Sequence, residues 1–122
     1  MNVQRVKLIK NMLDHYRVRA HVVESLFADE VMAAYNFDTH SIEISQNNID
    51  SPREFILSVL HEINHAMMAR RMGRRIFKKK YMIESNFLSY HSKDPYWDNK
   101  YEIQAETFAR QNYKRWVKFR PV

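Results

Sequence analysis

Hydrophobic and polar residues follow a helical period at the start of this chain. In residues 2–16, Val6, Ile9, Leu13 and Tyr16 fall on one side of a helix, and charged residues occupy most of the other positions. We therefore expect an amphipathic N-terminal helix that turns its apolar side toward the rest of the protein.

A second, longer helix is expected over residues 52–72, because the sequence carries signals for both of its ends. Ser51 suits the N-cap, Pro52 the first helical position and Glu54 a capping box, while Gly73 suits the end of the helix. Apolar residues recur between these ends at helical spacing: Phe55, Val59, Ile63, Ala66 and Met67. We expect the first three of these to pack against a sheet.

Three shorter segments between the two helices read as strands. Residues 18–27 are rich in β-branched and apolar types, and residues 31–37 and 42–44 flank a short polar turn, as in a hairpin. Residues 46–50 then read as a loop into the second helix. The pattern predicts a small, mainly antiparallel sheet over residues 18–46.

The C-terminal part is less regular. Residues 81–91 fit no single pattern, residues 93–98 read as a loop, and residues 101–119 read as a final helix. Within the loop, the aromatic pair Tyr96-Trp97 favours packing over the core, with substrate binding as the alternative.

These elements predict an α+β fold with an N-terminal helix, a small sheet, a central helix and a C-terminal helix. A length of 122 residues suits a single domain spanning residues 1–122. The chain has no cysteine, so a zinc site would have to use histidines and carboxylates. No signal peptide is recognisable and no apolar run reaches the roughly 18–20 residues of a membrane span, so we expect a cytoplasmic protein without membrane contact.

Charge is distributed unevenly along the chain. Residues 1–69 have a formal net charge of −3, whereas residues 70–122 have +9. Seven of the eleven residues in 70–80 are basic: Arg70, Arg71, Arg74, Arg75, Lys78, Lys79 and Lys80. A solvated helix end is the simpler interpretation, and a surface that binds nucleic acid is the alternative.

The strongest chemical signal is the pattern His-Glu-x-x-His at residues 61–65. On a helix, His61 and His65 share one face and can converge on one zinc ion. Glu62 follows the first histidine, so it can reach a water molecule activated by the metal without binding the metal itself. This position suits a general base.

A catalytic zinc ion usually has three protein ligands, so one more is required. A metzincin would carry a third histidine six residues after the second, but Arg71 stands there. The final helix offers Glu102 and Glu106, which share one face at a spacing of four residues. We favour Glu102 as the ligand and Glu106 as a hydrogen-bond partner of a ligand histidine. Glu106, His91 or an aspartate remain alternatives for the third ligand.

His61-Glu62-x-x-His65 followed by Glu102-x-x-Ala105-Glu106 resembles the gluzincin arrangement of thermolysin-like proteases. The flanking segments are similar to the small ImmA/IrrE-type metallopeptidases, and the small size is reminiscent of minimal proteases encoded by phages. The resemblance implies a minimal zincin-like domain in which Glu102 binds zinc and Glu106 supports a histidine. It covers roughly residues 31–111; the chain departs from it at residues 110–115, which are polar where the family is commonly apolar.

The function expected from these residues is zinc-dependent hydrolysis of peptide bonds in a protein substrate, with Glu62 as the base. Candidates for stabilising the oxyanion are Tyr90, His91, Tyr96 and Tyr101. The alternative is a zincin-fold module that binds nucleic acid or protein through the basic segment and holds a non-catalytic metal. An accidental motif in a structural protein is a further alternative.

Overall fold

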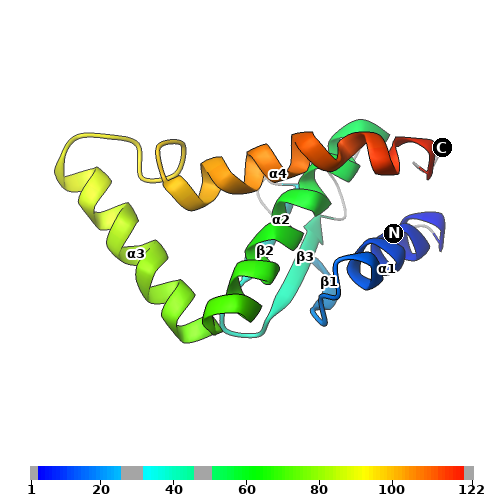
Figure 1. The fold of residues 1–122 in the computed structure, drawn as a ribbon, viewed down its shortest axis with the longest axis horizontal. Coiled ribbons are helices and arrows are strands. Elements are labelled where there is room, and N and C mark those ends of the chain that lie inside the picture. Colours follow the sequence, from blue (N-terminus) through cyan, green and yellow to red (C-terminus); the bar gives the residue numbers. More distant parts are fainter. Residues whose placement is uncertain (1–2, 26–31, 46–50, 120–122) are drawn as a thin grey trace.

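A computed structural model describes residues 3–25, 32–45 and 51–119. The predicted loop over residues 46–50 lies outside the described residues, as do parts of the predicted strand segments. The elements in chain order are α1 (Val3–His15), β1 (His21–Ser25), β2 (Ala33–Asn36), β3 (Ser41–Ser45), α2 (Pro52–Met72), α3 (Arg74–Tyr90), α4 (Lys100–Trp116) and the short 3-10 helix η1 (Val117–Phe119). This composition confirms the predicted α+β fold (Figure 1).

The sheet has three strands in the order β1-β3-β2. The predicted hairpin is confirmed, since β2 and β3 pair antiparallel with Ala33 opposite Ile44. At the other side of β3, β1 pairs in parallel with His21 opposite Ser41, so the sheet is mixed rather than mainly antiparallel. In the described sheet β3 therefore lies in the centre, and β2 lies at one edge.

Helix α2 has the predicted ends. The Ser51 hydroxyl accepts a hydrogen bond from the Glu54 backbone N–H at 3.4 Å, which satisfies one of the free donors of the first turn. At the other end, Gly73 has φ of 87°, a conformation that residues with a side chain rarely adopt. Phe55, Val59 and Ile63 are buried in the same core cluster as the strand residues Ile42 and Ile44. The helix therefore packs on the sheet through its predicted face.

Helix α3 is the main element that the sequence pattern left unassigned. Its first half is anchored by Phe77, whose ring lies 5.1 Å from that of Phe37 and 5.4 Å from that of Tyr101. Figure 1 shows α3 extending from the end of α2, with a loop that leads back into α4. The predicted loop over residues 93–98 lies in this connection.

Helix α4 packs against α2, and side chains near its C-terminal end contact Tyr16, which follows α1. The Tyr16 hydroxyl donates to Asn112 Oδ1 at 3.0 Å and accepts from the Trp116 indole at 3.0 Å. These hydrogen bonds link the segment that follows α1 to the C-terminal part of α4. Within the described ranges, no helix combines the length and the apolar character that a bilayer crossing requires.

Candidate metal centre

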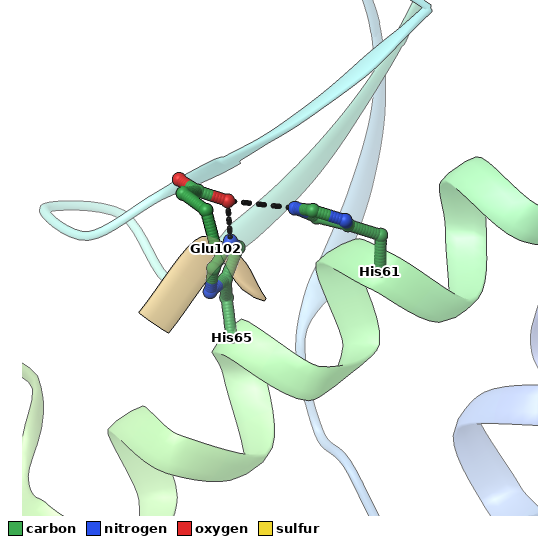
Figure 2. A group of neighbouring side chains, drawn as sticks. All are labelled: His61, His65 and Glu102. Carbon is green, nitrogen blue, oxygen red and sulfur yellow. Dashed lines mark hydrogen bonds and ion pairs between the residues drawn. The ribbon is translucent and has the colours of Figure 1, made fainter. Parts of the chain in front are cut away.

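The two histidines of α2 project from one face of the helix toward α4, as their spacing predicts. Their ring centroids are 5.0 Å apart, and both side chains are buried. Glu102, in the first turn of α4, places Oε1 2.7 Å from Nε2 of His61 and 2.9 Å from Nε2 of His65 (Figure 2). The fold thus brings together three residues that are separated by up to 41 positions in the sequence.

These three residues, which we call the His–Glu group, could hold a metal ion. One potential ligand atom from each lies within 4.8 Å of the others, and all three residues are buried. Two imidazoles and one carboxylate form a donor set that zinc accepts, and three protein ligands leave a position for a water or substrate. One carboxylate oxygen contacts two imidazole nitrogens directly, so the three potential metal-ligand atoms converge at one point.

Glu106 lies one turn after Glu102 and contacts the other ring nitrogen of His61, with 3.2 Å between Oε1 and Nδ1. A carboxylate can only accept a hydrogen bond, so Nδ1 of His61 is the donor and Nε2 faces Glu102. Partners of this kind orient the histidines of metal sites. Nδ1 of His65 is also buried, and no hydrogen-bond partner for it lies among the described residues.

Glu62 is buried beside the His–Glu group without belonging to it. Its carboxyl group has a backbone hydrogen bond from Tyr35 on the edge strand β2. Burial raises the pKa of Glu62 to about 7, although the neighbouring His65 and His61 act to lower it. A carboxyl group with a pKa near neutrality can both accept and release a proton under physiological conditions.

Burial and contacts within the His–Glu group shift the pKa values of His61 and Glu102. Burial acts to lower the pKa of His61, but the hydrogen bond to Glu102 and the nearby acids raise it to about 9. Burial would raise the pKa of Glu102, but hydrogen bonds from His61 and His65 hold it well below its usual range. In the metal-free protein, His61 is therefore a cation paired with an ionised Glu102 at neutral pH.

Tyr81 of α3 was not among the predicted site residues, although it contacts the His–Glu group directly. Its hydroxyl donates a hydrogen bond to Oε2 of Glu102. Burial and this hydrogen bond raise the pKa of the phenol, which keeps the hydroxyl protonated as a donor. Its spacing of four residues from Phe77 predicts a shared helix face, but no sequence signal indicates that this face meets Glu102.

A cavity of about 630 Å³ opens beside the His–Glu group. Its walls include Glu62, the strand residues Ala33 and Ala34, and the aromatic pair Tyr96 and Trp97. The pair does not pack over the core as expected, because Tyr96 is 44% exposed and Trp97 is 70% exposed. Both side chains stand at the rim of the cavity, where they can contact a bound molecule.

A hydrogen-bonded turn holds this aromatic pair in place. The Asp94 carboxylate accepts from the backbone N–H groups of Tyr96 at 2.8 Å and Trp97 at 2.7 Å. The Asp98 carboxylate accepts in turn from the Asp94 N–H at 2.9 Å. Such side-chain to backbone bonds stabilise a compact turn, so the rim of the cavity is preorganised.

The predicted oxyanion candidates are placed differently. Tyr96 lines the cavity, whereas Tyr101 is buried and its ring stacks with that of Tyr81 at 6.2 Å. Tyr90 is 86% exposed at the end of α3, and His91 follows it at the surface. Among the described residues that line the cavity, Tyr96 is the only one of these four candidates.

The basic residues 70–80 extend over the end of α2 and the start of α3. Arg70 donates to the backbone carbonyl of Tyr16 at 3.2 Å, and Lys78 forms an ion pair with Asp38 at 2.8 Å. Arg74 donates to the Asp38 carbonyl at 2.8 Å. At least three of the seven cations therefore bond to other described parts of the protein.

Comparison with models of known protein families finds none that matches this chain. Comparisons with curated proteins and with solved structures likewise find no significant similarity. The function of this protein must therefore be inferred from the geometry of the site and from the sequence motif.

Proposed function

We propose that this protein is a zinc-dependent metallopeptidase of the gluzincin type, similar to the ImmA/IrrE-type enzymes. One observation carries the proposal: the His–Glu group converges in the wall of a cavity that Glu62 also lines. A metal site with a purely structural role would not require an additional buried acid beside it. Burial of an ionisable carboxyl group is costly, which favours a chemical role for Glu62.

The chain supplies the groups that peptide hydrolysis requires. A zinc ion held by the His–Glu group would polarise the scissile carbonyl and increase the acidity of a water molecule. Glu62 accepts the proton of this water and passes it to the leaving amine. The Tyr96 hydroxyl, whose pKa is raised by burial and by the charge of Glu102, remains protonated and donates a hydrogen bond to the oxyanion.

The edge strand β2 supports a peptide as the substrate class. Ala33 and Ala34 line the cavity, and β2 has its second side free of the other strands of the described sheet. An extended peptide can add to such an edge through main-chain hydrogen bonds. The small alanine side chains leave room for a substrate backbone to approach the His–Glu group.

The direct test is hydrolysis of a fluorogenic unfolded protein, such as labelled casein, with zinc present. The wild-type protein should cleave it, and Glu62→Gln should reduce the rate at least about 100-fold while retaining the metal, because the amide cannot accept a proton. Asp14→Asn, which removes an exposed carboxylate of α1 that does not line the cavity, is the matched control and should remain active. Wild-type activity in Glu62→Gln would contradict the mechanism, and a zinc-loaded wild-type protein that cleaves no peptide bond would favour a non-catalytic metal site.

A further inference from the structure

The outer face of α3 exposes large apolar side chains that the core does not use. The helix buries Phe77 and Leu88 on one side. Four residues on another side have exposed fractions of 53, 58, 56 and 86%, respectively, and form what we call the α3 stripe: Ile76, Ile83, Phe87 and Tyr90. Exposure of so many large apolar side chains on one helix marks an interaction surface.

The spacing of the α3 stripe matches the seam of a helix pair. Its residues follow one another at intervals of seven, four and three, which are the intervals between a and d positions of a heptad. With about 100° of rotation per residue they fall within an arc of about 60°, and they extend over about 21 Å of the helix. A narrow and long stripe suits one partner helix, whereas helices that lie on membranes present a broader apolar face.

The charges beside the α3 stripe specify the partner further. Lys79 and Lys80 flank the stripe on its two sides and are exposed. Neither forms an ion pair with another described residue, in contrast to Lys78, which pairs with Asp38. The acid of this helix, Glu84, accepts a hydrogen bond from the Lys100 backbone N–H. The stripe therefore has cationic borders that are available to carboxylates of another molecule.

We propose that the α3 stripe docks an acidic amphipathic helix of a partner protein, a binding function beyond the proposed peptidase activity and independent of it. Apolar side chains of the partner would cover Ile83 and Phe87, and its flanking glutamates would pair with Lys79 and Lys80. A second copy of this chain fits less well, because lysines would then face lysines. Nucleic acid fits less well, because apolar residues rather than cations occupy the centre of the surface.

The probe for this proposal is a labelled helical peptide with leucine at its a and d positions and glutamate at its e and g positions. Its binding to the whole protein is measured by fluorescence anisotropy at low salt. Ile83→Ser combined with Phe87→Ser should weaken binding at least about tenfold, a typical effect for central apolar contacts. Met82→Ser is the matched control, because Met82 is 49% exposed on a different side of the same helix and should not affect binding.

Charge reversal separates this partner from the other candidates. Lys79→Glu with Lys80→Glu should weaken binding of the acidic peptide and create binding of a peptide with lysine at the e and g positions. Equal binding of both peptides by the wild-type protein would overturn the proposal, as would a lack of binding to the acidic peptide. It would also be overturned if the α3 stripe were required for binding duplex DNA or anionic vesicles, or for self-association in sedimentation experiments.

Discussion

The Tyr81 hydroxyl donates a hydrogen bond to Oε2 of Glu102, while the other oxygen of the same carboxylate meets both histidines of α2. Glu102 is therefore fixed from two sides, by α3 and by α2. This contact gives α3 a role in the candidate metal centre, because the helix orients a carboxylate on a third element, α4.

Removing the hydroxyl group in Tyr81→Phe should weaken zinc binding about tenfold, the lower end of the range for groups that orient metal ligands. The ring contacts of Tyr81 with Phe37 and Tyr101 would remain, so the fold should be retained. Competition titration with a chromophoric chelator measures the affinity. Tyr90→Phe, at an exposed position, is the control, and an unchanged affinity in Tyr81→Phe would show that the hydroxyl does not orient Glu102.

Glu106→Ala should reduce zinc affinity about 10–100-fold without abolishing binding, because Glu106 contacts the ring nitrogen of His61 that faces away from Glu102. Glu106→Gln should have a smaller effect, since the amide oxygen still accepts from Nδ1. The same chelator competition measures both variants. Complete loss of zinc in Glu106→Ala, combined with retention in Glu102→Ala, would reverse the predicted roles of the two acids.

The metal-free protein should become less stable as the pH rises from about 6.5 to 9. The pKa of His61 is raised to about 9 in the folded state, so the stabilisation by its cation is complete below 6.5 and is lost as pH rises through 9. The shift corresponds to about 3 kcal/mol. The buried Glu62 changes stability in the same direction at lower pH, because its pKa is raised from 4.5 to about 7 in the folded state.

Urea unfolding at several pH values, with chelator present, measures this effect. With saturating zinc, the free energy of unfolding should instead increase between pH 6 and 9. Metal binding requires a neutral imidazole and therefore becomes stronger as pH rises. A metal-free stability that stays constant over this interval would be inconsistent with a cationic His61.

Gly73→Ala should destabilise the protein by about 1–3 kcal/mol, the cost of placing a side chain in a backbone conformation that favours glycine. The φ angle of 87° is the cause, because a Cβ atom at this position would meet no other atom within 4 Å. Thermal unfolding measures the difference, and Asn86→Ala in the exposed middle of α3 is the control. A change below about 0.5 kcal/mol would show that the junction between α2 and α3 relaxes easily.

The parts of the fold that the sequence predicts best are those with local signals. Ser51 and Gly73 mark the ends of α2, and a spacing of four residues within each of two helices predicts the faces that carry His61, His65 and Glu102. The hairpin of β2 and β3 also depends on neighbouring residues. That α2 and α4 meet at these residues was inferred from the number of ligands that a metal site requires. The structure places the three side chains together.

Features that depend on distant contacts were not predictable in the same way. Helix α3 has apolar residues on its inner face and along the α3 stripe, so the sequence does not show which of these residues the core buries. The parallel pairing of β1 with β3 joins segments that no local turn connects. The exposure of Trp97 was likewise not predictable, because hydrophobic character alone predicts burial. It depends on the position of the turn formed by residues 94–98, which follows α3.

A zinc titration followed by calorimetry tests most directly whether the His–Glu group binds a metal ion. The wild-type protein and Glu62→Gln should each bind one equivalent of zinc with similar affinity. His65→Ala and Glu102→Ala should lose this binding, because each removes one of three ligands. Absence of zinc binding by the wild-type protein, or binding by His65→Ala with unchanged affinity, would show that the His–Glu group is not a zinc site.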